Sequence, residues 1–290
     1  MFDGTIVALV TPFRDGKVDE KALIDLIERC MAEGASGFVP CGSTGESATL
    51  SHDEHRQVVE VTVKAVAGRR KVIAGTGSNN TQEAIALTRH ARAVGADGAL
   101  LISPYYNKPT QEGIYLHYKA VAEAADLPII VYNIPGRTAS NILPETLARL
   151  SGIENIVGVK EASGNLEQIA QVARLCGPDF DLLSGDDALT LPTLAVGGCG
   201  VITASANLIP GDMAALCSAW AAGDTGRARA VHQKILPLWN ALYLESNPIP
   251  IKAALALQGH IAEELRLPLT KMTAQNREKL RLAMKDYGLL

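Results

Sequence analysis

Runs of consecutive apolar residues alternate with longer amphipathic segments along the first 200 residues of the chain. The apolar runs predict eight strands, at residues 5–10, 37–41, 71–74, 98–102, 128–132, 155–160, 181–183 and 200–203. Their residues are apolar in succession rather than alternately, which is typical of strands buried on both faces. Helical segments fill the gaps, and one of them begins at Ser51, whose spacing to Glu54 is that of a capping box.

Eight strands in about 200 residues, each followed by a helical segment, favour an α/β fold of the closed (β/α)8 TIM-barrel type. An open doubly wound sheet is the alternative, but the G-x-G-x-x-G turn that would support it is matched only partly, by Gly75-Thr76-Gly77. The strands stop before residue 212, and helices are expected at 212–222, 226–240, 249–257 and 274–286. We therefore predict a barrel over residues 1–224 and a C-terminal helical extension over residues 225–290.

Composition excludes several classes of protein. The 290 residues carry a formal net charge of −4, which argues against a nucleic-acid partner. No apolar stretch reaches about 18 residues and no basic segment precedes the first apolar run, so we expect no membrane span, no signal peptide and a cytoplasmic location. The five cysteines lack C-x-x-C spacing, and His52 and His55 match neither common zinc-hydrolase motif. We therefore expect no disulfide framework, no metal and no cofactor.

Polar residues that follow the predicted strands carry the candidate chemistry, because barrel enzymes place their active sites at the carboxyl ends of the strands. Lys160 closes the apolar run at 155–160 and is expected to point into the barrel mouth, where desolvation lowers the pKa of an amine and makes it nucleophilic. The structural alternative is an ion pair between Lys160 and an acid such as Glu161.

Three further strand ends supply groups that suit such a lysine. Tyr132 ends the neighbouring strand, and its phenol is placed to exchange protons above the amine. The turn that contains Ser43 and Thr44 offers hydroxyls and backbone N–H groups for a carboxylate, and Arg137 offers a bidentate guanidinium. Taken singly, each residue also fits a purely structural role, as a core tyrosine, an ordinary turn or a solvated loop arginine.

Eight segments in order make the chain resemble the dihydrodipicolinate synthase family, within the superfamily of pyruvate-dependent class I aldolases and N-acetylneuraminate lyases. The likeness covers essentially the whole chain. The segments are GSTGESATL (42–50), AGTGSN (74–79), PYYNKPTQEG (104–113), YNIPGRT (132–138), GVKEASGN (158–165), LSGDD (183–187), GVITASAN (200–207) and NPIPIK (247–252).

The resemblance implies a lyase of diaminopimelate and L-lysine biosynthesis that condenses pyruvate with L-aspartate 4-semialdehyde and needs no cofactor. Lys160 matches the lysine that forms a Schiff base with pyruvate. Thr44, Tyr132 and Tyr106 match a proton relay in which the last tyrosine comes from a neighbouring subunit, so the resemblance also implies a homo-oligomer, a dimer within a tetramer. The residues that match substrate-binding positions are Ser43, Thr44, Arg137, Gly185 and Ile202.

One departure concerns the choice of aldehyde. The first motif of the family usually has two threonines, whereas this chain has Ser43-Thr44, a form that is also common in N-acetylneuraminate lyase. Serine keeps the hydroxyl, so the relay should survive. Ser47-Ala48, Arg137 and Gly185-Asp186-Asp187 favour the synthase over a lyase that acts on a sugar-like aldehyde, and the intact lysine argues against a non-catalytic carboxylate-binding barrel.

The resemblance also implies feedback inhibition by L-lysine at a dimer interface. Seven positions match those of lysine-sensitive members: Ser47, Ala48, His52, His55, Asn79, Glu83 and Tyr105. Glu83 would supply a negative charge for the ammonium group of the ligand.

Overall fold

A closed barrel of eight parallel strands forms the centre of the molecule in the computed structural model, which describes residues 1–290. The neighbours run in chain order around the barrel, and the first strand closes it by pairing with both the second and the last. The strands are β1 (Gly4–Ala8), β4 (Gly37–Val39), β5 (Lys71–Gly75), β6 (Gly98–Ile102), β7 (Ile129–Asn133), β8 (Ile156–Glu161), β9 (Asp181–Ser184) and β10 (Gly200–Thr203). The predicted barrel is confirmed, and the doubly wound alternative is wrong.

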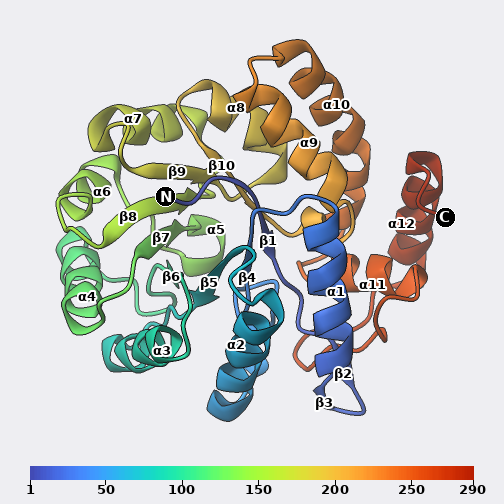
Figure 1. The fold of residues 1–290 in the computed structure, drawn as a ribbon, viewed down its shortest axis with the longest axis horizontal. Coiled ribbons are helices and arrows are strands. Elements are labelled where there is room, and N and C mark those ends of the chain that lie inside the picture. Colours follow the sequence, from blue (N-terminus) through green and yellow to red (C-terminus); the bar gives the residue numbers. More distant parts are fainter.

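Helices surround the barrel as an outer layer (Figure 1). They are α1 (Glu20–Ala32), α2 (His52–Val66), α3 (Thr81–Ala93), α4 (Gln111–Ala124), α6 (Pro144–Leu150), α7 (Leu166–Cys176), α8 (Thr190–Ala195) and α9 (Pro210–Ala221). The predicted capping box is present at the start of α2, where Ser51 and Glu54 each bind the backbone N–H of the other.

Short elements were missed by the sequence patterns. A two-stranded hairpin, β2 (Phe13–Arg14) with β3 (Lys17–Val18), follows the first barrel strand, and a one-turn helix, α5 (Pro135–Thr138), follows the fifth. Each is four residues or shorter, so neither is long enough for a hydrophobic period to recur along it.

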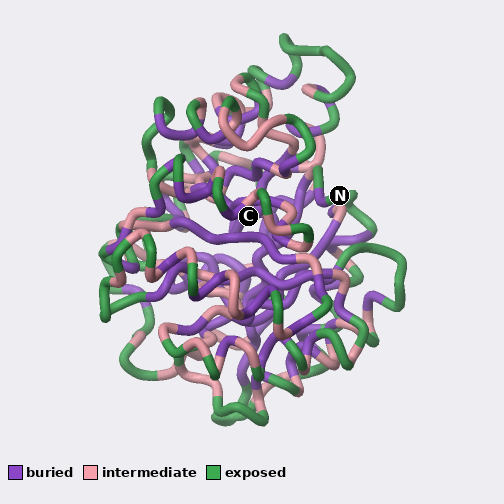
Figure 2. The backbone as a smooth tube through the Cα atoms, turned by 90° about the vertical axis from the view of Figure 1, so that its left-hand side faces the viewer, coloured by how far each residue is buried: buried purple, intermediate pink, exposed green.

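The apolar core has two layers. Ten buried side chains, among them Phe2, Ile73 and Ile130, fill the barrel interior, and a larger cluster packs the outer faces of the strands against the helices. Figure 2 shows the buried backbone running through the middle of the molecule, with exposed segments at the periphery. Both strand faces are therefore covered, which explains the continuous apolar runs in the sequence.

The chain ends in three helices, α10 (Thr225–Leu242), α11 (Ile249–Leu257) and α12 (Ala274–Tyr287). α10 packs against α9, and α12 packs against α10 and α11 (Figure 1). The boundary at residue 224 stays a prediction. None of the helices combines the length and apolarity that a membrane span requires.

Candidate active site

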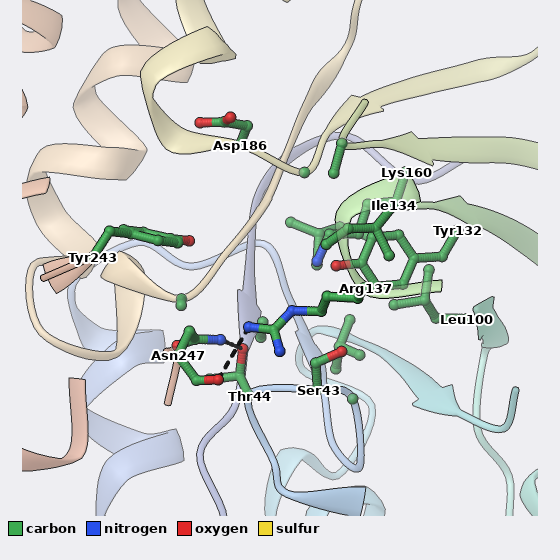
Figure 3. A pocket seen from close by; sticks show the side chains of 17 residues that line it. Ser43, Thr44, Leu100, Tyr132, Ile134, Arg137, Lys160, Asp186, Tyr243 and Asn247 are labelled. Carbon is green, nitrogen blue, oxygen red and sulfur yellow. Dashed lines mark hydrogen bonds between the residues drawn. The ribbon is translucent and has the colours of Figure 1, made fainter. Parts of the chain in front are cut away.

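A cavity of about 120 Å³ opens at the carboxyl ends of the barrel strands. About 10–15 Å³ of such space holds one water molecule, so the cavity has room for a three-carbon keto acid. Side chains from several strands and from the C-terminal helices meet there (Figure 3). The residues that line the cavity include Ser43, Thr44, Tyr132, Arg137, Lys160, Gly185, Asp186, Ile202, Tyr243 and Asn247.

Lys160 is the buried amine of this cavity. It lies one residue before the end of β8, in register with Tyr132 of β7, and is only 6% exposed. Burial lowers the pKa of Lys160 to about 7, with the negative charge of Asp187 opposing the shift and the positive charge of Arg137 adding to it. Half of the amine is therefore neutral near pH 7, as a nucleophile requires.

The ion pair of Lys160 with Glu161 that the sequence left open is absent. Successive side chains of a strand point to opposite faces, so Glu161 faces the helix layer while Lys160 faces the cavity. The Glu161 carboxylate accepts hydrogen bonds from the Asn133 side chain at 3.1 and 3.0 Å and from the Ser163 N–H at 2.7 Å. Both of its oxygens are thus occupied by neutral donors.

Tyr132 lies directly beside the amine, with the Lys160 Nζ 4.4 Å from the centre of its ring. Burial raises the pKa of Tyr132 to about 12, against the opposing effects of the Arg137 charge and a hydrogen bond with Ser43. The phenol is therefore protonated at neutral pH. It can donate its proton to a reacting oxygen and recover it from a neighbouring hydroxyl.

The loop with Ser43 and Thr44 forms another side of the cavity. The Thr44 hydroxyl accepts a hydrogen bond of 3.0 Å from the Asn247 side-chain amide. A side chain at Gly45 would bring its Cβ within 3.0 Å of the Cys41 backbone nitrogen, so glycine lets the turn fold tightly beneath Thr44. Hydroxyls and free backbone N–H groups in such a turn suit a substrate carboxylate.

A buried ion pair anchors the loop that contains Ser43 and Thr44 to the C-terminal extension. Glu46 binds the ammonium group of Lys252, which is fully buried on α11. Lys252 also donates to the Glu264 carbonyl at 2.9 Å, and the backbone N–H of Arg266 donates to Glu46 at 3.2 Å. The Phe13 ring packs against the charged groups of Lys252 and Arg266, with its centre 4.2 Å from the Lys252 Nζ and from the Arg266 Cζ. The C-terminal extension thereby holds the Ser43–Thr44 loop in place.

Arg137, Gly185 and Ile202 complete the predicted set within the cavity. Arg137 lies on α5 and donates to the Asn247 carbonyl at 3.1 Å, with the rest of its guanidinium turned into the cavity (Figure 3). A Cβ on Gly185 would lie 2.9 Å from the Lys160 Cε, so only glycine leaves room for the lysine at this point. Ile202 on β10 contributes apolar surface.

Tyr106 is the one predicted catalytic residue that this chain does not bring into the cavity. It is 88% exposed and has a φ of 73°, a left-handed conformation that is uncommon for an aromatic residue. The loop thus presents its ring outward.

A second pocket, of about 250 Å³, contains six of the seven positions predicted for L-lysine. Glu83 lies 3.3 Å from His52 and accepts a hydrogen bond from Ser78, while His55 is bonded to the Gly75 carbonyl at 2.8 Å. The six residues are Ser47, Ala48, His52, His55, Glu83 and Tyr105. The seventh, Asn79, does not line the pocket, but its side-chain amide donates to the Tyr105 carbonyl at 3.0 Å.

Sequence reasoning missed the contribution of the C-terminal extension to the cavity. Asn247 and Tyr243 both line it, and Asn247 contacts Thr44 across 203 positions of sequence. The segment NPIPIK was a usable signal for Asn247, whereas Tyr243 lies outside every recognised segment. No group of three or more His, Cys, Asp or Glu side chains is arranged to hold a metal ion.

Comparisons with known proteins agree along the whole chain. A family model described as the dihydrodipicolinate synthetase family matches residues 1–287. A curated relative named 4-hydroxy-tetrahydrodipicolinate synthase, from Syntrophus aciditrophicus, is 59% identical over 290 residues, with 100% of each protein covered.

Two similar solved structures contain bound ligands. A dihydrodipicolinate synthase from Cyanidioschyzon merolae with lysine bound is 45% identical, with a TM-score of 0.97 over 100% of this chain and 99% of that one. The chloride-inhibited enzyme from Acinetobacter baumannii, complexed with pyruvate, is also 45% identical, with a TM-score of 0.98 over 100% of both chains. These similarities confirm the predicted lyase activity, that of 4-hydroxy-tetrahydrodipicolinate synthase, and the chain belongs to the dihydrodipicolinate synthetase family.

Proposed function

We propose that the chain condenses pyruvate with L-aspartate 4-semialdehyde through a Schiff base on Lys160. The observation that carries this assignment is a buried amine with no carboxylate partner, whose pKa is about 7, at the floor of a cavity lined with hydroxyls. An ordinary lysine, with a pKa of about 10.4, would be neutral in only about one molecule in 2,500 at pH 7.

The reaction begins when the neutral Lys160 amine attacks the ketone carbon of pyruvate. The carbinolamine loses water and leaves a protonated imine, which withdraws electrons from the methyl group. Loss of a methyl proton gives an enamine, whose carbon attacks the aldehyde of the second substrate to form a carbon–carbon bond. The amino group of that substrate then attacks the imine carbon, closes the ring and expels the lysine amine.

Proton movements are assigned to hydroxyls around Lys160. The Tyr132 phenol, which keeps its proton at neutral pH, donates to the leaving oxygen of the carbinolamine and takes the methyl proton back. The Thr44 hydroxyl relays the proton between Tyr132 and the next hydroxyl. Tyr106 of a second copy of this chain would complete the relay, because its outward-facing ring suits an interface between two subunits. We propose a dimer on this basis, within the tetramer that the family resemblance implies.

Substrate carboxylates have two matching sites. Ser43 and Thr44 hold the pyruvate carboxylate beside the amine, and the Arg137 guanidinium binds the carboxylate of the semialdehyde. Gly185 and Ile202 shape the space around the imine, the first by lacking a side chain and the second through apolar contact.

We also propose that L-lysine inhibits the enzyme at the second pocket. Glu83 would bind the ligand's ammonium group, and Ser47, Ala48, His52, His55, Asn79 and Tyr105 would surround the rest. The lysine-bound relative supports this reading. A third cavity shares Ser43 and Tyr132 with the catalytic cavity, and Ser47 and Tyr105 with the second pocket.

A coupled assay tests the catalytic proposal. Purified protein with pyruvate, L-aspartate 4-semialdehyde and a chelator should form product, and borohydride with pyruvate alone should add the reduced adduct to Lys160 by peptide mass. An adduct without turnover would mean that the imine is right and the aldehyde is wrong, which favours a sugar-like aldehyde. No adduct would overturn the mechanism.

Lysine inhibition has its own test. Millimolar L-lysine should slow turnover, and Glu83→Gln should raise the concentration for half-inhibition by about tenfold or more, since a charge-assisted hydrogen bond is lost. An unchanged rate at millimolar L-lysine would contradict the proposal.

A further inference from the structure

Tyr243 lines the catalytic cavity, but none of the proposed steps of imine formation involves it. It directly follows α10 and reaches the cavity from the C-terminal extension. Figure 3 shows its hydroxyl pointing toward the middle of the cavity, with Lys160 and Tyr132 on the far side. The residue is 42% exposed, so it lies at the mouth, where a second substrate must enter after pyruvate is bound.

The Tyr243 hydroxyl has no hydrogen-bond partner in the chain, although its ring is firmly held. The hydroxyls of Tyr118 and Tyr287 donate to a backbone carbonyl at 2.8 Å and to the Asp212 carboxylate at 2.6 Å. The Tyr243 ring instead stacks on Trp239, with the ring centres 4.7 Å apart and the planes inclined by 30°. A fixed phenol with both its donor and its acceptor free is suited to bind a ligand.

The charges around the hydroxyl indicate what it would bind. Burial and the negative charges of Asp187 and Asp186 raise the pKa of Tyr243, with Arg137 opposing them, so the phenol is neutral. Asp186 lines the same cavity and Arg137 extends into it from another wall (Figure 3). One Asp186 oxygen accepts a hydrogen bond from the Ala188 N–H at 3.1 Å, which leaves the other oxygen without a partner in the chain. A carboxylate oxygen and a guanidinium thus lie on separate walls of the cavity, as a zwitterionic amino acid would require.

We propose that Tyr243, together with Asp186, binds the ammonium group of the aldehyde substrate while Arg137 binds its carboxylate. The inference rests on the proposed condensation and deepens it by assigning the groups that recognise an α-amino acid. The phenol oxygen accepts a hydrogen bond from the ammonium group, and the Asp186 carboxylate supplies the charge. Pyruvate on Lys160 lies deeper and does not reach Tyr243.

The variant Tyr243→Phe removes only the hydroxyl and keeps the stacked ring. We expect the KM for L-aspartate 4-semialdehyde to rise about three- to tenfold, as for the loss of one hydrogen bond. The KM for pyruvate and the rate of borohydride trapping should not change. Asp186→Asn should raise the same KM without altering trapping.

A deaminated probe tells the ammonium contact from a change in pocket shape. 4-Oxobutanoate has the aldehyde and the carboxylate but no amino group, so its inhibition constant against the semialdehyde should be the same for the wild type and Tyr243→Phe. Tyr287→Phe is the matched control, because that hydroxyl binds Asp212 away from the cavity, and both its KM values should match the wild type. Urea midpoints will verify that each variant is folded.

The possible outcomes distinguish a failure of the Tyr243 assignment from a failure of the proposed condensation. An unchanged semialdehyde KM in Tyr243→Phe, beside normal wild-type turnover, overturns this inference and leaves the condensation intact. An equal rise in the inhibition constant for 4-oxobutanoate overturns the ammonium assignment. A wild type that traps pyruvate but never consumes the semialdehyde overturns both proposals.

Discussion

Two buried lysines, Lys160 and Lys252, differ in whether a carboxylate binds the amine. Lys160 is 6% exposed and has no carboxylate in contact with its amine, whereas Lys252 is fully buried and bound to Glu46. Burial lowers the pKa of both, but for Lys252 the charge of Glu46 and its hydrogen bond oppose that shift. The unpaired lysine is therefore available for chemistry, and the paired one holds the loop that carries Thr44.

The comparison shows that burial alone does not identify a catalytic lysine. A buried amine becomes nucleophilic near neutral pH when no bound carboxylate offsets the effect of burial on its pKa. An amine with a buried partner is costly to disturb, because removing either member leaves an unpaired charge out of water. Replacing the two lysines by the same apolar residue should consequently damage different properties of the protein.

Lys160→Met should give the largest effect. We expect turnover to fall by at least about 10⁴-fold, since removal of a covalent nucleophile abolishes the reaction path. The free energy of unfolding should stay the same or increase, because an apolar side chain avoids the desolvation cost of an unpaired amine. Turnover, borohydride trapping and urea unfolding measure the three quantities. Full activity in this variant would remove Lys160 from the mechanism.

Lys252→Met should reverse that pattern. It leaves Glu46 buried without its cation, so we expect the free energy of unfolding to fall by about 3–5 kcal/mol. The double variant Glu46→Gln with Lys252→Met should recover part of the loss. Folded Lys252→Met protein should still trap pyruvate on Lys160, although more slowly if the loop shifts.

The double variant is also the control for this interpretation. Equal stability of the single and double variants would mean that the cost comes from lost packing rather than from the unpaired carboxylate. In that case the paired lysine would be an ordinary core residue.

Part of this contrast was readable in the sequence. Lys160 follows an apolar strand at the point where barrel enzymes act, and this position is enough to predict its exposure to the cavity. Lys252 lies in a segment with helical character, where a lysine normally faces solvent. Its burial depends on Glu46 and Arg266, which are distant in sequence, and no local pattern reports such a contact.

The fold was predictable for a related reason. Continuous apolar runs report burial on both faces, and this property belongs to each strand separately. The cavity wall formed by Tyr243 and Asn247 was not predictable in the same way, because it depends on how the extension packs on the barrel. Tyr106 stays a prediction, since a single chain leaves it exposed.

The pH dependence of imine formation tests the pKa of Lys160. Below pH 7 the neutral fraction of an amine falls tenfold per unit, so the rate of borohydride-trapped adduct formation at low pyruvate should rise to about pH 7 and level off above it. A rate that keeps rising to pH 10 would contradict the lowered pKa.

Stability should respond to the same group. Between pH 7 and about 10 the unfolded chain, with an ordinary lysine, binds more protons than the folded one, so Lys160 makes stability rise with pH across this window. Below pH 7 both states are protonated and the dependence ends. Lys160→Met should lack this rise, which urea unfolding at several pH values would detect.

The smallest effect is expected at a second ion pair that closes the same C-terminal segment onto α2. Arg266 donates to both oxygens of Glu54, at 2.7 and 2.6 Å, but both side chains are partly exposed, in contrast to Lys252 and Glu46. Glu54→Gln keeps a side chain that can complete the capping box, and should cost about 1 kcal/mol or less with turnover retained. The pair with Arg266 lowers the pKa of Glu54 to about 2, so its contribution should be complete above about pH 5 and lost as the pH falls toward 2. Urea unfolding of both proteins at pH 7 and at the lowest pH where they remain folded measures the difference. A loss as large as that of Lys252→Met would show that partners, rather than burial, set the strength of these pairs.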